Sequence, residues 1–137
     1  MSLGIFKVPD PKNEPVRGYA PGSPERASLQ AKLEELAAQR PEIPLRIGGK
    51  EIRTGRIAQA VMPHDHQHVL ADVHLAGPAE VQLAIEAAAK AKDFWARMPW
   101  EERVAIFLKA ADLLAGPYRD TLNAATMLGQ SKTCHQA

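Results

Sequence analysis

Cys134, the only cysteine in the 137 residues, has the most reactive side chain and lies in the sequence SKTCHQA. A cysteine thiolate can attack a carbonyl carbon, and a nearby cation or helix N-terminus favours the thiolate form. Lys132 and His135 are the neighbours that could act in this way. Adjacent helical residues, however, point about 100° apart, so sequence adjacency does not make His135 a base for Cys134. We therefore predict a small, buried or half-buried cysteine without a catalytic role.

Three histidines at a spacing of two, His64, His66 and His68, form the second group that could carry chemistry. In an extended strand this spacing puts all three imidazoles on one face, beside Asp65, so a metal site is one interpretation. The other interpretation is a polar, solvated turn, because Pro63 interrupts the strand and leaves two of the histidines in the loop. We favour the turn and assign no metal ligand in this chain.

Gly48-Gly49 is the third feature, because glycine-rich loops can hold phosphate groups. A nucleotide loop needs a longer glycine pattern between a buried strand and a helix, and that pattern is missing. Two short β-prone runs flank the pair in IPLRIGGKEIRT, which is typical of a tight hairpin turn. The sequence therefore predicts a structural turn here, and we assign no cofactor-binding and no catalytic residue in this chain.

Two hairpins and a series of helices are expected to position these groups. The hairpins are expected over residues 43–54 and 57–75, the second with its turn in MPHDHQH. Ser23-Pro24-Glu25 begins a helix that Pro41 ends near residue 39, with an apolar stripe of Leu29, Leu33 and Leu36. Gly77-Pro78-Ala79-Glu80 begins the next, in which Glu80 can reach back as in a capping box.

The stretch from Pro99 to Ala137 is expected to form consecutive helices. Pro99 suits a first helical position, Gly116 is a candidate left-handed cap, and Pro117 can begin the next helix, which Gly129 closes. The expected core-facing residues are Val104, Phe107, Leu108, Ala111, Leu114 and Ala115 in the first helix, and Leu122, Ala125 and Leu128 in the second. Ser131 is a candidate N-cap of a third helix that has room for only about two turns. We therefore expect this sequence to be part of a longer polypeptide.

Trp95 and Trp100 flank the break between two of these helices and are expected to be packing anchors. At the other end, residues 1–22 contain four prolines with little periodicity, which predicts an extended arm.

Composition excludes several classes of function. Seventeen basic and sixteen acidic residues nearly balance, and no basic run suits a phosphate backbone, so we expect no nucleic-acid partner. No apolar run approaches the roughly 20 residues that span a bilayer, so we expect no membrane partner. A single cysteine suits a reducing compartment, and the first residues lack a secretory or mitochondrial import pattern. Together these features predict a cytoplasmic protein.

Three segments carry a family resemblance: NEPVRGYAPGSPER, MPHDHQHVLADVHLAG and PWEERVAIFLKAADLLAGPYRDTLNAATMLGQSK. With the region from Gly77 to Met98, they resemble the N-terminal region of the aldehyde dehydrogenase superfamily. There a hairpin leads into a helix, a tryptophan, a proline-acid-acid-arginine opening and an apolar helix. Within the superfamily these segments are most similar to the members that oxidise L-glutamate γ-semialdehyde to L-glutamate in proline breakdown.

The resemblance implies an α/β fold, of which this chain would be the mainly helical N-terminal part. It implies an arm over 1–22, a helix with two hairpins of a bridging or oligomerisation region over 23–76, and helices of a Rossmann-like NAD-binding domain over 77–137. The cofactor it implies is NAD, and its partners would be the remainder of the dehydrogenase chain and further copies in a homo-oligomer. The family's cysteine nucleophile and pyrophosphate-binding turn lie downstream of the region that this sequence resembles. We therefore expect this chain alone to be inactive and not to bind NAD.

A different class of function stays open. The chain could be a non-enzymatic interaction module derived from such a gene, whose exposed hairpin edges pair with a partner strand.

Overall fold

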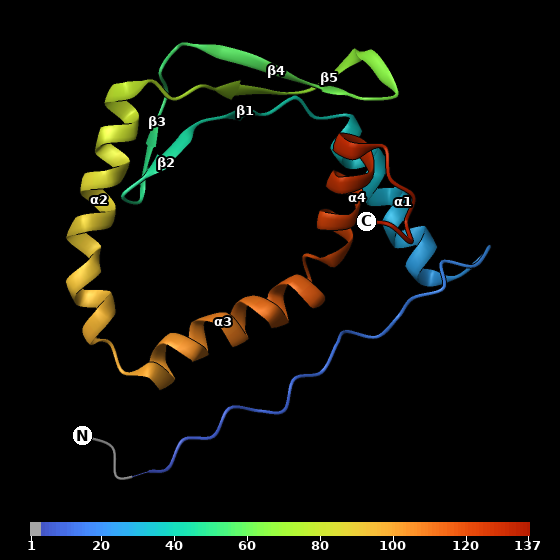
Figure 1. Ribbon diagram of the computed structural model, residues 1–137. Coiled ribbons are helices and arrows are strands. Elements are labelled where there is room, and N and C mark those ends of the chain that lie inside the picture. Colours follow the sequence, from blue (N-terminus) through green and yellow to red (C-terminus); the bar gives the residue numbers. More distant parts are fainter. Residues whose placement is uncertain (1–3) are drawn as a thin grey trace.

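The computed structural model describes residues 4–137, so residues 1–3 of the expected arm lie outside the described part. In chain order its elements are α1 (Pro24–Ala37), β1 (Glu42–Ile43), β2 (Leu45–Ile47), β3 (Lys50–Ile52), β4 (Ile57–Met62), β5 (Asp65–His74), α2 (Pro78–Arg97), α3 (Trp100–Ala115) and α4 (Arg119–Gln130). Figure 1 shows an arc in which the β4–β5 hairpin, α2 and α3 follow one another, and α4 returns to lie beside α1 and closes the arc. Both helices and strands are present and more residues lie in helices, as predicted.

The predicted starts of α1 and α2 are confirmed. The Ser23 hydroxyl accepts a hydrogen bond from the Arg26 N–H at 3.4 Å, and Pro24 occupies the first position of α1. At α2 the Gly77 N–H donates to the Glu80 carboxylate at 2.7 Å. Glycine has no side chain to return the second bond of a capping box, so only this half is formed.

The boundaries of α3 and α4 differ from the prediction in three details. Pro99 is the N-cap of α3 rather than its first residue, and α4 begins at Arg119, so Pro117 lies in the intervening turn. Gly116 has φ −102° and is not a left-handed cap, so that prediction is wrong. The position needs glycine for space, because a Cβ built there would lie 2.8 Å from the main-chain oxygen of Asp112.

Ser131 ends α4 instead of beginning a third helix. Its backbone is left-handed, with φ 54° and ψ 36°, which turns the chain away from the axis of α4. Residues 131–137 contain a turn, closed by hydrogen bonds from the N–H groups of Gln136 and Ala137 to the Thr133 carbonyl. The prediction of a third helix from Ser131 is therefore wrong for the residues described.

Both predicted hairpins are present. Strands β2 and β3 pair antiparallel around Gly48 and Gly49, whose φ angles of 57° and 78° suit the tight turn that these glycines predict. In the second hairpin β4 pairs antiparallel with β5, and only Pro63 and His64 remain between the two strands. One feature was not predicted: β1 adds to this sheet by pairing in parallel with β5, giving the order β1-β5-β4.

The main hydrophobic core lies between the arm, α1 and α4. Tyr19, Leu29 and Ala124 are its buried members, and Leu33, Leu36, Met127 and Cys134 pack against them. The predicted stripe of α1 is thus confirmed. The predicted face of α4 is wrong, because Ala124 is fully buried whereas Leu122 is 44% exposed. The large leucines of α1 fill the interface, so α4 meets them with a small residue.

Arm residues near Tyr19 are fastened to the start of α4. Arg17 pairs with the Asp120 carboxylate at 3.1 Å, the Ser28 hydroxyl of α1 donates to the other oxygen of that carboxylate, and Arg119 donates to the Pro15 carbonyl at 2.7 Å. Asp120 therefore joins three segments: the arm, α1 and α4. Earlier arm residues are extended and exposed (Figure 1).

Helices α2 and α3 have no buried residue in this structure. Their large apolar side chains are exposed: Phe94 by 68%, Phe107 by 65% and Leu114 by 51%. Trp95 packs edge-on against Phe107 across the α2–α3 corner, with ring centroids 6.4 Å apart, yet both tryptophans remain partly exposed. The predicted helix α3 is present. Its apolar stripe, however, is not covered by any other part of the residues described. Across residues 4–137, no helix has the length and apolar character to cross a membrane.

Two glycines of the helical region should respond in opposite directions to alanine. Gly116→Ala should lower the free energy of unfolding by about 1–3 kcal/mol, since the new Cβ would clash with the Asp112 carbonyl. Gly129→Ala, in α4 with nothing within 4 Å of its Cβ position, should raise it by about 0.5–1 kcal/mol. Urea unfolding of the polypeptide that carries this sequence measures both. Equal changes for the two variants would contradict the steric explanation of Gly116.

The Arg40–Asp72 ion pair should make the attachment of β5 to the end of α1 sensitive to acid. Arg40 donates to both carboxylate oxygens at 2.8 and 2.9 Å, and these hydrogen bonds, with the charge of Arg40, hold the pKa of Asp72 below its usual range despite partial desolvation. The pair therefore stabilises the fold above the ordinary carboxyl pKa, and its contribution is lost as the pH falls through the lowered value. Urea unfolding from pH 7 to pH 3 should show a smaller loss of stability for Asp72→Asn than for the parent. The same pH dependence in both proteins would refute this account.

Candidate functional site

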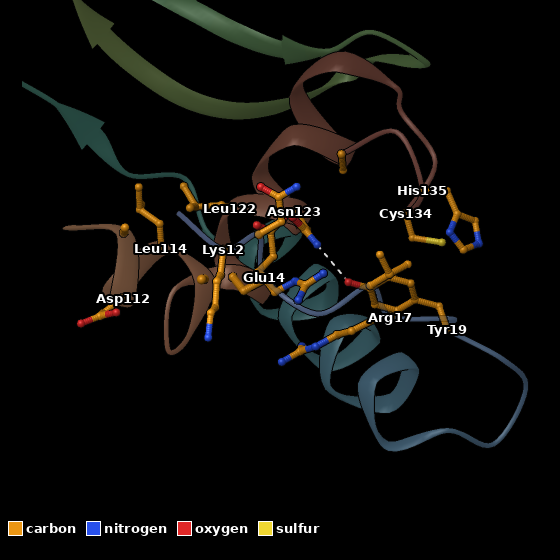
Figure 2. A pocket seen from close by; sticks show the side chains of 16 residues that line it. Lys12, Glu14, Arg17, Tyr19, Asp112, Leu114, Leu122, Asn123, Cys134 and His135 are labelled. Atoms are coloured by element: carbon orange, nitrogen blue, oxygen red, sulfur yellow. Dashed lines mark hydrogen bonds between the residues drawn. The ribbon is translucent and has the colours of Figure 1, made fainter. Parts of the chain in front are cut away.

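A cavity lies where the arm, the end of α3, the start of α4 and the last residues of the chain meet. Its volume is about 560 Å³. Figure 2 shows Cys134 and His135 beside Tyr19 on one side of this cavity, with Asp112 and Leu114 on the other. The cavity brings together side chains that could take part in chemistry, and a cavity of this kind is a candidate binding site.

The two arginines that line the cavity are already engaged. Arg17 pairs with Asp120, and Arg119 donates to the Pro15 carbonyl. The Tyr19 hydroxyl, in turn, accepts from the Asn123 side-chain amide at 3.0 Å, the bond that is dashed in Figure 2. These three interactions therefore hold the arm against α4.

Cys134 and His135 lie next to each other without forming a nucleophile–base pair. Among the described residues no hydrogen bond joins them, and the His135 ring meets Tyr19 edge-on, with centroids 5.9 Å apart and an interplanar angle of 72°. Cys134 is half-buried and packs against the Tyr19–Leu29–Ala124 core, which confirms the predicted environment of its side chain. The arrangement supplies packing and offers no activated thiol by geometry.

The three histidines of the second hairpin are only partly as predicted. His66 and His68 belong to β5, so the predicted turn is shorter than MPHDHQH, and only His64 lies in it. His64 Nδ1 lies 2.8 Å from the Ser131 hydroxyl, whereas His68 Nε2 lies 2.9 Å from the Ala37 carbonyl oxygen. Their imidazoles thus reach different helices. Within residues 4–137 no three His, Cys, Asp or Glu side chains gather in a way that could hold a metal ion.

A carboxylate–imidazole pair, which sequence reasoning missed, joins β1 to β5. His74 is buried, with 4% of its surface exposed, and its Nε2 lies 2.6 Å from a Glu42 carboxylate oxygen. This hydrogen bond, assisted by the charge of Arg53 and opposed by desolvation, lowers the pKa of Glu42. Such a pair could orient a general base. Here, however, the Gly55 N–H donates to His74 Nδ1 at 3.2 Å, so neither ring nitrogen is free for a substrate.

No signal in the sequence pointed to this pair or to the Asp120 anchor. Glu42 and His74 are 32 residues apart, and Arg17 and Asp120 are 103 apart. A spacing pattern finds partners within one element, whereas these pairs depend on how separate elements meet.

The Gly48-Gly49 turn does not have the geometry of a pyrophosphate-binding turn for NAD. Gly48 and Gly49 join two antiparallel strands, whereas a pyrophosphate-binding turn joins a strand to a helix. A Cβ at Gly48 would meet the Cβ of Ala87 at 3.4 Å, so this turn packs closely on α2. The turn therefore provides contact between the hairpin and the helix, and we derive no cofactor chemistry from it.

Curated relatives match almost the whole sequence. The chain is 54% identical over 136 residues to delta-1-pyrroline-5-carboxylate dehydrogenase of Agaricus bisporus, and the match covers 98% of this chain and 25% of that protein. It is 42% identical over 125 residues to the human protein of that name, described as mitochondrial, with 91% of this chain and 22% of that protein covered. The chain thus spans about a quarter of the length of these relatives.

Solved structures show the same arrangement of elements. The Delta-pyrroline-5-carboxylate dehydrogenase of Mycobacterium tuberculosis, bound with NAD and cobalamin, matches with a TM-score of 0.95 and 47% identity, over 99% of this chain and 26% of that one. The 1-pyrroline-5-carboxylate dehydrogenase from Thermus, with bound NAD, matches with a TM-score of 0.80 and 29% identity, over 90% and 24% respectively.

A family model agrees with these likenesses. The model described as the aldehyde dehydrogenase family matches residues 52–137, which is more than half of the sequence. Hairpin β4–β5 and helices α2, α3 and α4 all lie within this range. The resemblance carried by the sequence segments is thereby confirmed: this chain belongs to the aldehyde dehydrogenase family.

Proposed function

We propose that this chain is the N-terminal quarter of an NAD-dependent dehydrogenase that oxidises L-glutamate γ-semialdehyde, the open form of 1-pyrroline-5-carboxylate, to L-glutamate. The observation that carries the proposal is the 54% identity, along 98% of the chain, to a relative named for this activity. An NAD-bound structure with a TM-score of 0.94 and 47% identity supports NAD as the cofactor.

The role of this chain within such an enzyme is structural. Cys134 is half-buried and has no hydrogen-bonded base among the described residues. Both ring nitrogens of His74 are hydrogen-bonded, and the Gly48-Gly49 turn does not have the geometry of a nucleotide-binding turn. The catalytic nucleophile, the cofactor loop and the substrate pocket are therefore supplied by the rest of the dehydrogenase. These residues position other parts of the enzyme and do not touch the reacting atoms.

Exposed apolar surface supports the remainder of the dehydrogenase as the main partner. Ile5 and Val16 of the arm are exposed by 101% and 98%, and α2 and α3 expose their apolar side chains without burying any residue. Isolated helices gain most of their stability from packing an apolar face. We infer an arm over 1–22, a bridging segment over 23–76 and helices of the NAD-binding domain over 77–137, all covered in the full enzyme.

Two further features belong to the proposal. We expect the full enzyme to be a homo-oligomer, since the free edge of β4 can pair with a strand of another copy. We also propose a cytoplasmic location, because a single cysteine suits a reducing compartment.

The alternative function is a non-enzymatic interaction module. The exposed edge of β4 and the uncovered faces of α2 and α3 would then bind a separate protein. The length comparison favours the dehydrogenase. The match covers only 25% and 24% of two of the relatives, so the rest of each relative is available to cover these faces.

The reading frame beyond codon 137 provides the test. A polypeptide extended along that frame should reduce NAD in the presence of L-glutamate γ-semialdehyde, measured as NADH absorbance, whereas residues 1–137 alone should show no turnover. In the extended protein Cys134→Ser should leave kcat/KM within about twofold, because its thiol takes no part in the reaction.

Each element of the proposal can fail separately. Turnover by residues 1–137 alone, free of host enzyme, would refute the structural role. A stop codon after 137 with a monodisperse, folded product would favour the interaction module. An extended protein that loses activity with Cys134→Ser while keeping its fold would refute the site analysis.

A further inference from the structure

We propose that the tip of the β4–β5 hairpin caps the C-terminal end of α1 through His68 and holds Ser131, the residue that ends α4, through His64, and so clasps the sheet onto this helix pair. Two of the three histidines that suggested a metal site in the sequence, His64 and His68, would then connect the hairpin to the two helices. The proposal rests on the contacts of the hairpin tip and is independent of the enzyme's activity.

The end of α1 is only partly capped by its own main chain, through the Gln39 N–H, which donates to the Leu36 carbonyl at 3.2 Å. A helix leaves its last four carbonyls without intrahelical partners, and a glycine cap or a basic side chain commonly satisfies them. Here the C-cap is Ala38 with an ordinary helical φ of −76°, and the last turn contains no basic residue. His68 Nε2 lies 2.9 Å from the Ala37 carbonyl oxygen. Since a carbonyl only accepts, Nε2 must carry the proton, and β5 supplies the missing donor.

The same hairpin also contacts the residue that ends α4. Its last turn also lacks a basic residue, and its cap, Ser131, adopts a left-handed backbone that a side-chain-bearing residue rarely adopts. His64 Nδ1 lies 2.8 Å from the Ser131 hydroxyl, a contact between residues 67 apart in sequence. One hairpin tip thus reaches the C-terminal ends of two helices that pack against each other.

An irregularity in the strand ladder makes this reach possible. Val61 pairs with Val69, whereas Met62 pairs with Asp65, so residues 66–68 have no paired residue on β4. Such a bulge bends a strand and changes the direction in which its side chains point. Met62 is 7% exposed at the same place, so it anchors the tip while His64 and His68 reach the helices.

Amide hydrogen exchange of the purified polypeptide, followed residue by residue by NMR, tests the clasp. His68→Leu should speed exchange in the last turn of α1, and His64→Leu in the last turn of α4, each by about two- to tenfold, as expected for loss of one hydrogen bond. His66→Leu is the matched control, because His66 is exposed on the same tip and has no hydrogen-bond partner within the described residues. It should change neither helix end by more than about twofold.

NMR spectra of the histidine ring nitrogens show which nitrogen carries the proton, and general destabilisation of the fold would not change this result. His68 should carry its proton on Nε2 in the parent protein, and this signal should persist in His66→Leu. An equal response to all three substitutions, an unprotonated Nε2 in His68, or unprotected helix ends in the parent would overturn the clasp. A concerted shift of the three rings with one equivalent of Zn²⁺ would overturn it in favour of a metal site.

Discussion

The packing of Tyr19 between α1 and α4 is the contact on which the described structure most depends. This residue is 7% exposed and has a positive φ of 49°, an uncommon backbone for a tyrosine, and its hydroxyl accepts from Asn123 at 3.0 Å. Through it the arm, the first helix and the last helix share one small core, although they come from opposite ends of the sequence. The α1–α4 pair closes the arc in Figure 1, since the intervening hairpin, α2 and α3 connect these two ends in sequence.

That core is too small to explain the shape of the whole chain. Its buried members are Tyr19, Leu29 and Ala124, and α2 and α3 contribute none. The same arc nevertheless matches the Mycobacterium tuberculosis structure with a TM-score of 0.95. Few internal contacts hold this arrangement, yet it recurs within a chain about four times as long. This agrees with helices whose apolar faces pack on surfaces outside this sequence.

The polar side chains also serve to connect elements. Each imidazole that forms a hydrogen bond, at His64, His68 and His74, joins two elements, and the cations near the cavity hold the arm. Polar side chains here act as connections in a chain with little apolar core. This explains why His64, His68 and the Glu42–His74 pair, which resemble motifs typical of chemistry, act as connections between elements.

Sequence reasoning succeeded for several features whose cause lies within a few residues, although it failed for the caps at Gly116 and Ser131. The Ser23 cap, the Glu80 bond to Gly77 and the Gly48-Gly49 turn each depend on local backbone geometry, so the starts of α1 and α2 and the first hairpin were predicted correctly. The leucine stripe of α1 was also predicted, since large apolar residues at helical spacing have few alternatives to burial.

What only the tertiary structure decided concerns relations between distant segments. The face that α4 buries follows from the leucines of α1, which leave room for Ala124 rather than Leu122. The left-handed Ser131 and the orientation of the histidines depend on a hairpin and two helices meeting, and the Glu42–His74 pair depends on a parallel strand contact. By itself, then, the sequence determined the local elements and the family, because caps, turns and periodicity are local. It did not determine the contacts between elements, because those energies arise only when distant residues are brought together.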